Sequence, residues 1–494
     1  MNKETTPQKI LDQHLWKSFD QFRGLLSAES AFSLLLQLLF YKFLEDNRDD
    51  IGIEQKSHQL NFPEQYRFSN LMLSKESELS ETLSKALLAL EEINDPLLVG
   101  VFLQSDLNYF DRRYHRQTGR LLMELISMID TLNFNSKYLS KEGTAFSAIF
   151  ADLLDKHTET ELRRSGGFMV PKSLRELLAH LNNISSKPEE TVYDPACGTG
   201  ALLMNVVRYA ESSSSNLTTA FAQERNMTSL SLAKMQWIIN GQDPNNIAVG
   251  DALSHPQFTQ NGNLQKFDKV ISCPPFGMSG WGAERAAGDP YHRFDWGTPP
   301  ASKADYAYIL HAIASLKPSG TAFLVSIAGV LFRGGAEEQI RRKMIDNNII
   351  SAIISLPAGL FNLWNVPLCI LCLRKAEERR PEGLLMIDLA SYPNQVRDKE
   401  GLNASTINAI VESVKEFFDN QQVATKHETF NKIVTKEELA ANDYNLNIAR
   451  YFAAGETKTV VDAAMLSKEI IQLEDELSAL DLKIRELKGQ LKIS

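Results

Sequence analysis

A long stretch of the chain, from about residue 165 to residue 375, alternates short β-rich runs with segments of helical periodicity. TVYDPA precedes ALLMNVVRYAE, TAFAQE precedes MTSLSLAKMQWIIN, and further pairs of the same kind follow. Strands that alternate with helices in this way form βαβ units, whose parallel sheet is covered by helices on both faces. The sequence therefore predicts an α/β fold with a doubly wound, mostly parallel sheet.

The segments on either side of this alternation have a different pattern. Residues 1–160 carry apolar residues at helical spacing almost throughout, which predicts an N-terminal helical domain. We assign residues 161–400 to the domain with the sheet and residues 401–494 to a C-terminal helical region. Within that region, residues 466–491 repeat Leu and Ile in 4-3-4-3 steps, which is typical of a coiled-coil seam. We favour pairing with a partner's helix over packing within the chain, because the apolar stripe is narrow.

Composition and charge exclude several classes of protein. The longest apolar runs, such as AFSLLLQLLFYKFL, are shorter than a membrane span requires. Four cysteines in 494 residues argue against a disulfide framework and favour a reducing, cytoplasmic location. A net charge of -10 argues against binding nucleic acid through bulk electrostatics. A DNA substrate would therefore require a local basic groove or a partner protein.

The segment VYDPACGTGALLM contains a glycine-rich turn between a strand and a helix. We expect the strand to end at Asp194 and the helix to begin near Ala201, with Gly198 and Gly200 allowing a tight turn between them. This arrangement brings backbone amides close to a ligand at a helix N-terminus. The turn alone is a weak signal, because dinucleotide-binding and nucleoside-binding proteins share it.

Two acidic residues follow at the ends of the next two predicted strands. Glu224 ends TAFAQE, where an acidic side chain is placed to bind ribose hydroxyls. Asp251 follows IAVG, a position suited to an adenine amino group. Either residue alone could equally cap a helix. Three consecutive strand ends in this order favour an adenosine-type cofactor.

The fourth strand, in FDKVIS, leads into Cys273, Pro274, Pro275 and Phe276. Ligands of a doubly wound sheet bind beside the carboxyl ends of its strands. A base rotated out of a duplex needs an aromatic ring to stack on and hydrogen bonds to its exposed edge. Phe276 supplies the ring, and rigid carbonyl groups beside the prolines supply acceptors for an exocyclic amine.

These motifs resemble, in order and nearly end to end, those of one family. GGFMVP, DPACGTGALL, AQERN, GDAL, CPPFG and DYNLNIARY are similar to segments of the modification (M) subunits of type I restriction-modification systems. Those subunits methylate adenine N6 in DNA with S-adenosylmethionine. The resemblance implies a Rossmann-like S-adenosylmethionine-dependent methyltransferase fold and an adenine-specific DNA methyltransferase (EC 2.1.1.72).

The resemblance also implies site residues and partners. Cys273, Pro274, Pro275 and Phe276 would form the catalytic segment, and no metal is expected. The partners would be double-stranded DNA, a separate specificity subunit and a second M subunit, and whether a restriction subunit joins is left open. The cofactor pocket would be lined by Gly167, Phe168, Met169, Val170, Pro171, Asp194, Gly198, Thr199, Gly200, Ala201, Glu224 and Asp251.

Three departures from the family pattern keep a second function open. Cys273 stands where the family has Asn or Asp, and a neutral thiol is a weak acceptor. Met169 and Val170 replace Tyr and Thr, and residues 362–365 replace a glycine-containing turn. The alternative is a catalytically weak or inactive scaffold of a DNA-targeting complex. A nucleophilic role for Cys273, as in cytosine methylation, is disfavoured because the thiol precedes the prolines instead of following them.

The link at residues 277–301 is longer than a plain connection requires, and loops of this length are usually functional. Arg285 and Arg293 within it are candidates for phosphate contacts, although an ordinary surface role is at least as well supported.

Overall fold

The computed structural model describes most of the chain and forms two compact units, Met1–Asn447 and Ile448–Ser494. Of the second unit, it describes only the short 3-10 helix η9 (Ile448–Arg450) and the two residues after it. The predicted coiled coil at 466–491, the 362–365 turn, and Gly167, Phe168 and Met169 lie outside the described residues. The described residues are 28–54, 56–102, 115–135, 146–165, 170–184, 187–214, 218–360, 366–375, 383–391, 396–398, 401–420 and 430–452.

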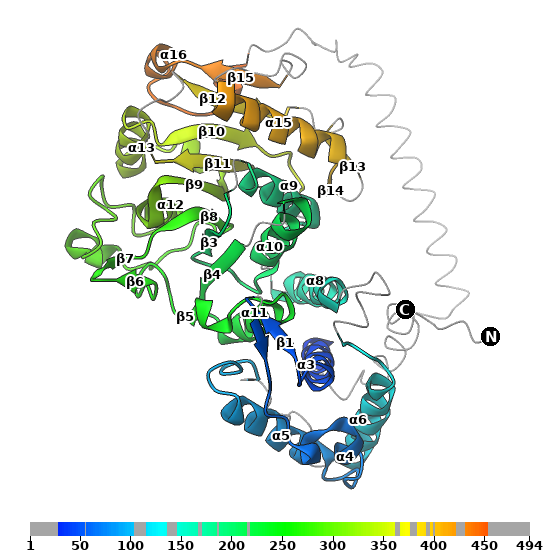
Figure 1. Ribbon diagram of the computed structural model, residues 1–494. Coiled ribbons are helices and arrows are strands. Elements are labelled where there is room, and N and C mark those ends of the chain that lie inside the picture. Colours follow the sequence, from blue (N-terminus) through cyan, green and yellow to red (C-terminus); the bar gives the residue numbers. More distant parts are fainter. Residues whose placement is uncertain are drawn as a thin grey trace, which may run out of the picture. The chain divides into compact units, whose positions relative to one another are not determined.

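A nine-stranded sheet forms the centre of the first unit (Figure 1). Its spatial order is β15-β12-β10-β11-β9-β8-β3-β4-β5. Most neighbouring strands run parallel, whereas β11 is antiparallel to both of its neighbours and β15 is antiparallel to β12. The predicted α/β fold with a mostly parallel sheet is therefore confirmed. The strands are β3 (Glu190–Asp194), β4 (Thr218–Glu224), β5 (Ile247–Val249), β8 (Phe267–Ser272), β9 (Leu316–Ile327), β10 (Ile350–Ser355), β11 (Leu368–Arg374), β12 (Leu384–Asp388) and β15 (Asn431–Val434).

The strand order reverses between β3 and β8. From β3 the chain builds outward through β4 to β5, and it then returns to the other side of β3 as β8 and continues to β9. Such a switch point leaves a crevice at the carboxyl ends of the strands, where ligands of doubly wound sheets bind. The glycine-rich turn after β3 and the segment after β8 therefore lie at adjacent strand ends.

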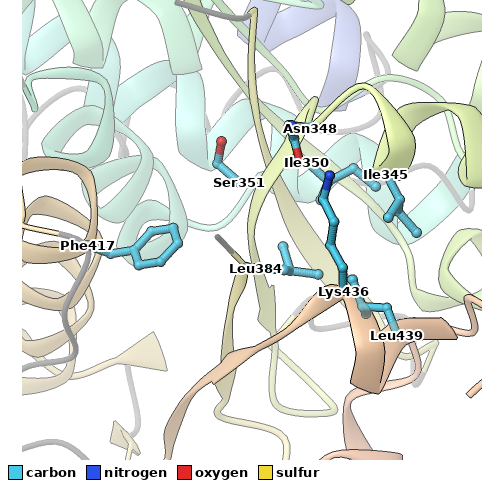
Figure 2. Close-up of a pocket in the computed structure, with 9 residues that line it drawn as sticks. Ile345, Asn348, Ile350, Ser351, Leu384, Phe417, Lys436 and Leu439 are labelled. Atoms are coloured by element: carbon cyan, nitrogen blue, oxygen red, sulfur yellow. The ribbon is translucent and has the colours of Figure 1, made fainter. Parts of the chain in front are cut away.

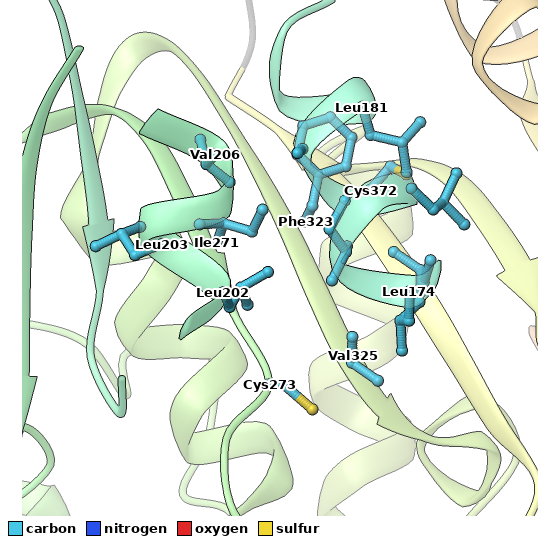
Figure 3. Packing of buried hydrophobic residues seen from close by; sticks show 14 of the residues in the cluster. Leu174, Leu181, Leu202, Leu203, Val206, Ile271, Cys273, Phe323, Val325 and Cys372 are labelled. Carbon is cyan, nitrogen blue, oxygen red and sulfur yellow. The ribbon is translucent and has the colours of Figure 1, made fainter. Parts of the chain in front are cut away.

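Helices cover both faces of the sheet, as the sequence pattern predicts (Figure 1). Alternate strand residues such as Val192, Ile271 and Phe323 belong to one apolar cluster with residues of α9, α10 and α15 (Figure 3). The helices α12 and α13 lie against the opposite face. The helices around the sheet are α9 (Lys172–Asn182), α10 (Ala201–Ser214), α11 (Met227–Ile239), α12 (Asp305–Ser315), α13 (Ala336–Asp346), α15 (Ala404–Asn420) and α16 (Lys436–Ala441).

The N-terminal helices have their own apolar cluster, which also includes residues of α11. Because Trp237 of α11 packs in the sheet's cluster and Met235 packs in the N-terminal cluster, this helix is apolar all round. The predicted boundary at residue 160 falls inside α8 and remains a prediction. The N-terminal helices are α3 (Ala28–Asp46), α4 (Phe68–Leu71), α5 (Leu79–Ile93), α6 (His115–Asp130) and α8 (Phe146–Ser165), with the 3-10 helix η2 (Glu64–Tyr66).

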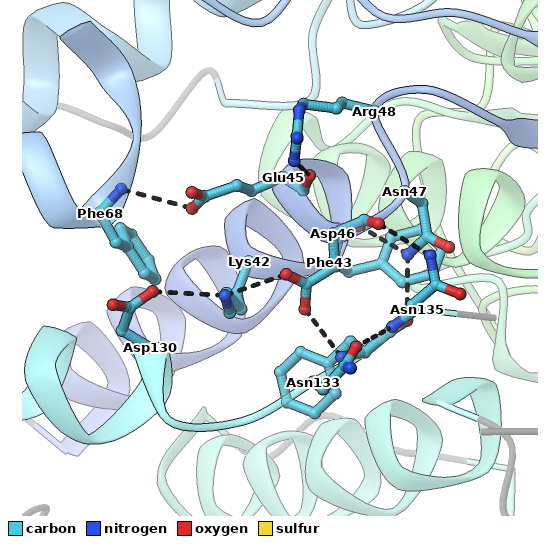
Figure 4. A network of polar contacts seen from close by, with 11 residues as sticks. Lys42, Phe43, Glu45, Asp46, Asn47, Arg48, Phe68, Asp130, Asn133 and Asn135 are labelled. Carbon is cyan, nitrogen blue, oxygen red and sulfur yellow. Dashed lines mark hydrogen bonds and ion pairs between the residues drawn. The ribbon is translucent and has the colours of Figure 1, made fainter. Parts of the chain in front are cut away.

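A partly buried ionic network around Lys42 ties the end of α3 to the end of α6 (Figure 4). Lys42 Nζ lies 2.9 Å from an oxygen of Asp46 and 3.3 Å from an oxygen of Asp130. Asp46 also accepts a 2.8 Å hydrogen bond from the amide of Phe134. Burial raises the pKa of Asp46, while Lys42 and the Phe134 amide oppose that rise. The network fixes the crossing of the two helices, because breaking one partner would leave an unpaired buried charge.

Short strands occur in segments whose sequence pattern predicts helices. A hairpin of β1 and β2 lies in the N-terminal region, and β15 joins the sheet from the region predicted to be helical after residue 400. Strands this short contain too few residues to show periodicity. The small hairpins and 3-10 helices are β1 (Ile51–Ile53) with β2 (Lys56–His58), β6 (Thr259–Gln260) with β7 (Asn263–Leu264), β13 (Arg397–Asp398) with β14 (Gly401–Leu402), η5 (Pro244–Asn246), η6 (Ala283–Gly288) and η7 (Ala328–Leu331).

In the part of the chain that the structure describes, no helix is both long and apolar enough to cross a membrane.

Candidate functional site

The carboxyl ends of β3 and β8 are joined directly by a side-chain hydrogen bond. Ser272, the last residue of β8, donates from Oγ to Oδ1 of Asp194 at 2.6 Å, and Asp194 is the last residue of β3. Both side chains are buried. The turn that starts after Asp194 and the segment that starts after Ser272 therefore leave the sheet from adjacent, connected points.

The glycine-rich turn has the conformation that its sequence predicts. Gly198 and Gly200 have φ values of +57° and +79°, which residues with a side chain rarely adopt, and α10 begins at Ala201 as expected. A Cβ atom on Gly198 would meet nothing within 4 Å, so the space above this residue is open. A Cβ atom on Gly200 would lie 2.6 Å from Cζ3 of the buried Trp237. The first glycine therefore faces free space, and the second allows close packing against α11.

Glu224 connects the ends of β3, β4 and β5. Its Oε2 accepts from the amide of Gly198 at 2.9 Å, and its backbone oxygen accepts from the amide of Gly250 at 2.9 Å. Its Oε1 accepts from the amide of Asn226 at 2.7 Å. Because an ionised carboxylate offers about four acceptor positions, Glu224 keeps capacity for a ligand's hydroxyl groups.

Asp251 lies just beyond the end of β5 and is half-buried. Its Oδ1 accepts from the amide of Leu253 at 2.9 Å, so the side chain also stabilises its own turn. No helix begins at Asp251, so the alternative role of a helix cap does not apply, and the side chain stabilises a turn instead. Ligand binding by Asp251 remains a prediction.

Asp194 has an unusual electrostatic position. Burial raises its pKa to about 7, although the hydrogen bonds from Ser272 and from the amide of Ala196 counteract that rise. Both donors contact Oδ1, and Oδ2 has no hydrogen-bond partner among the described residues. Asp194 thus presents one oriented, unpaired oxygen at the switch point.

This pKa predicts a pH-dependent stability that Asp194→Asn should remove. The folded-state pKa lies above the ordinary value, so stability is present at low pH and is lost as pH rises toward 7. Between pH 5 and pH 8 we expect Asp194→Asn to gain about 2.5 kcal/mol relative to wild type, since each pH unit between pH 5 and the folded-state pKa corresponds to about 1.4 kcal/mol. Urea unfolding of both proteins at the two pH values measures this difference. Parallel changes with pH would contradict the prediction.

The segment after β8, residues 273–276, is called the β8 tip below. Cys273 is buried at its base, within the apolar cluster that α9 and α10 form with the sheet (Figure 3). Burial raises the pKa of its thiol, and nearby Asp194 adds to the effect. The thiol is therefore neutral at physiological pH. Because the thiolate is the nucleophilic form of cysteine, this argues against a nucleophilic role for Cys273. A neutral thiol leaves the backbone carbonyl groups as the stronger acceptors of the tip.

Phe276 is at the half-buried end of the β8 tip. Its ring packs on the same cluster that contains Cys197 of the glycine-rich turn and Cys273. Val170, which precedes α9, packs on this cluster as well and is half-buried. Phe276 is therefore not enclosed in the interior, and its stacking on a base remains a prediction.

The long link at residues 277–301 is ordered around one arginine. Arg293 is buried, pairs with Asp289 at 2.6 Å and donates to the backbone oxygens of Ala252 and Leu253. Its suggested role as a phosphate contact is therefore wrong, because its guanidinium is used to hold the turn after Asp251. No sequence motif marked Arg293 for this role.

A broad hollow of about 610 Å³ lies between this link and the turn after β5. Its walls include Trp281, Tyr291, His255 and the exposed Arg285. A phosphate contact by Arg285 remains a prediction.

A narrow second pocket lies at the amino ends of strands, away from the carboxyl ends that carry the candidate site (Figure 2). It lies at the starts of β10 and β12, where Lys436 and Phe417 approach from α16 and α15. Ligands of doubly wound sheets bind at the carboxyl edge, so this pocket is separate from the candidate site.

The residues at the carboxyl edge fit S-adenosylmethionine. The open space above Gly198 would admit the cofactor, the half-buried Glu224 carboxylate would accept from its hydroxyl groups, and the unpaired Oδ2 of Asp194 would accept from a cationic group. Gly198, Thr199 and Ala201 are all partly accessible beside the start of α10. The cofactor would supply an electrophilic methyl group on its sulfonium centre.

Comparison with known proteins finds sequence families and relatives that match most or all of this chain. The sequence model described as N-6 DNA Methylase matches residues 141–459, and the model described as HsdM N-terminal domain matches residues 11–129. The Type I restriction enzyme MpnII methylase subunit of Mycoplasma pneumoniae is 26% identical to this chain, over 100% of this chain and 98% of that protein. The MjaVIII methylase subunit of Methanocaldococcus jannaschii is 28% identical, over 74% of this chain and 62% of that protein.

A solved structure has a similar fold. It is the methyltransferase subunit of a type I restriction-modification system from Streptococcus thermophilus. The TM-score is 0.74 at 24% identity, and the match covers 90% of this chain and 99% of that one. This likeness supports the fold described above.

Proposed function

We propose, from the premise that this chain belongs to the N-6 DNA methylase family, that it transfers a methyl group from S-adenosylmethionine to adenine N6 in DNA. The observation that carries the proposal is the Ser272–Asp194 hydrogen bond. It joins the last residues of β3 and β8, after which the glycine-rich turn and the β8 tip begin, and this supports donor and acceptor positions at neighbouring strand ends. Group transfer between two bound molecules depends on such placement.

Each residue of the edge has a defined task in this reaction. Glu224 accepts hydrogen bonds from ribose hydroxyl groups, and Asp251 accepts one from the adenine amino group of the cofactor. Asp194 offers its unpaired Oδ2 to a positively charged group of the cofactor. Phe276 stacks on the extruded adenine, and the backbone carbonyl groups of the β8 tip accept hydrogen bonds from its amine. These acceptors stabilise the positive charge that develops on the amine nitrogen during in-line transfer.

We further propose that a separate specificity subunit selects the DNA sequence. The net charge of -10 leaves the chain without bulk attraction for phosphates, and a partner can supply that attraction. The related methylase subunits are named as parts of type I restriction enzymes. The heptad-like segment at 466–491 is the proposed contact, and a second copy of the chain would complete the methylating complex. A cytoplasmic location suits four cysteines that are all buried and unpaired.

Methyl transfer with the cognate specificity subunit tests this function. We expect tritiated methyl groups from the cofactor to be incorporated into duplex DNA and recovered as N6-methyladenine after digestion. The chain without its partner should bind the cofactor but methylate little DNA.

The same assay separates the alternative of a weak or inactive scaffold, which the comparisons do not favour. Cofactor binding without transfer by wild type, together with transfer by Cys273→Asn, would support that alternative. Recovery of the label in another base would reject adenine N6 as the target.

A further inference from the structure

The backbone immediately after the β8 tip is held by a buried carboxylate. The amide of Gly277 donates to Oδ1 of Asp305 at 2.9 Å. Asp305 is the first residue of α12, and its side chain is only 1% exposed. The β8 tip therefore ends at a fixed point on α12, which covers the face of the sheet opposite to α9 and α10.

Two backbone hydrogen bonds strengthen this attachment. The amide of Ala304 donates to the oxygen of Met278 at 2.8 Å, and the amide of Gly280 donates to the oxygen of Ala301 at 3.2 Å. The start of the long link thus pairs with the residues that lead into α12. Asp305 stands at the end of this paired segment that is nearest the tip.

Arg333 provides the positive charge that keeps Asp305 in place. Its Nη2 lies 2.8 Å from Oδ2 of Asp305, and the same nitrogen donates to Oε1 of Glu337 at 2.9 Å. The Glu337 side chain, on α13, is 2% exposed. One guanidinium therefore pairs with two buried carboxylates, and its fixed geometry holds both at once. Removing it would leave two like charges unpaired in the interior.

We infer that Arg333 is a positioning residue for methyl transfer, which acts through Asp305 on the backbone of Gly277 and so on the β8 tip. This inference rests on the proposed function for its effect on rate. Arg333 follows the tip by more than fifty residues and belongs to none of the predicted site motifs. A shift of the tip by about 1 Å can cost about a hundredfold in rate, because the reacting atoms must remain aligned.

Arg333→Met tests the inference, with Arg342→Met as the matched control. Arg342 lies in α13 and pairs with Glu338 four residues earlier, in the same spacing as Arg333 and Glu337, but its side chain is 40% exposed. We expect Arg333→Met to speed hydrogen–deuterium exchange in the peptide that covers residues 273–280, whereas Arg342→Met does not. We also expect kcat for methyl transfer to fall by about 10- to 100-fold in Arg333→Met. Its Kd for S-adenosylmethionine should stay within about threefold of wild type, because the cofactor site lies on other strands.

Arg333→Lys provides a second variant that keeps the positive charge but not the two-sided geometry. We expect intermediate exchange and an intermediate rate. Unchanged exchange at 273–280 in both Arg333 variants would overturn the inference, and so would equal acceleration throughout the chain. Exchange does not require activity, so it decides the role of Arg333 even if wild type transfers no methyl group. That last result would instead reject the proposed function.

Discussion

Gly200→Ala is expected to lower the free energy of unfolding by about 3 kcal/mol. Gly200 has φ +79°, and its new Cβ would lie 2.6 Å from the ring of Trp237. A left-handed backbone costs a residue with a side chain about 1–2 kcal/mol, and overpacking a core typically adds about 1–3 kcal/mol. Trp237 is fully buried and cannot move aside freely. Urea unfolding followed by circular dichroism measures the change.

Gly198→Ala is the matched control, because it changes the same kind of residue in the same turn. Gly198 also has positive φ, but its Cβ would point into open space. We expect a loss of only about 1 kcal/mol in stability. Its methyl group would occupy the space in which the cofactor is proposed to bind, so Kd for S-adenosylmethionine should rise at least about tenfold, which corresponds to about 1.4 kcal/mol. Unchanged affinity in calorimetry would show that the cofactor does not approach this turn.

Phe276→Ala is expected to reduce kcat/KM for DNA methylation by about 10- to 100-fold. Stacking of a base on an aromatic side chain contributes about 1–3 kcal/mol, and this contribution is lost when the ring is removed. Affinity for S-adenosylmethionine should remain near that of wild type, because the ring is assigned to the adenine substrate. Steady-state methylation assays and calorimetry measure the two quantities separately.

Phe418→Ala controls for the loss of a half-buried ring. Phe418 packs on the same apolar cluster as Phe276, but it belongs to α15, where its ring lies 4.3 Å from the guanidinium of Arg374. We expect this variant to lose stability without losing methylation of the folded protein. Equal losses of kcat/KM in the two variants would show that Phe276 contributes only to packing.

The central architecture could be predicted from the sequence because its signals are local. β3 ends at Asp194, β4 ends at Glu224 and α10 begins at Ala201, as the pattern of apolar residues and glycines indicates. Each of these features depends on a few neighbouring residues, since periodicity and positive φ are properties of short segments. The shared edge of these strand ends then followed from the rule that ligands of doubly wound sheets bind beside the carboxyl ends of the strands.

The short strands could not be predicted in the same way. β15 has four residues, and it becomes a strand because β12 supplies its hydrogen-bonding partner. The hairpin of β1 and β2 has three residues in each strand. Strand formation in such segments depends on packing and pairing more than on intrinsic preference.

By itself, the sequence determined the positions of the glycine turn, the acidic strand ends and the rigid tip that contains Phe276. Only the tertiary structure decided what holds them. Ser272 reaches Asp194, Arg293 holds the turn after Asp251, and Arg333 reaches Gly277 through Asp305. These contacts join residues that are far apart in sequence. The tertiary fold brings each buried charge close to its partner. Spacing along the chain carries no information about such pairs, whereas backbone conformation is set by adjacent residues.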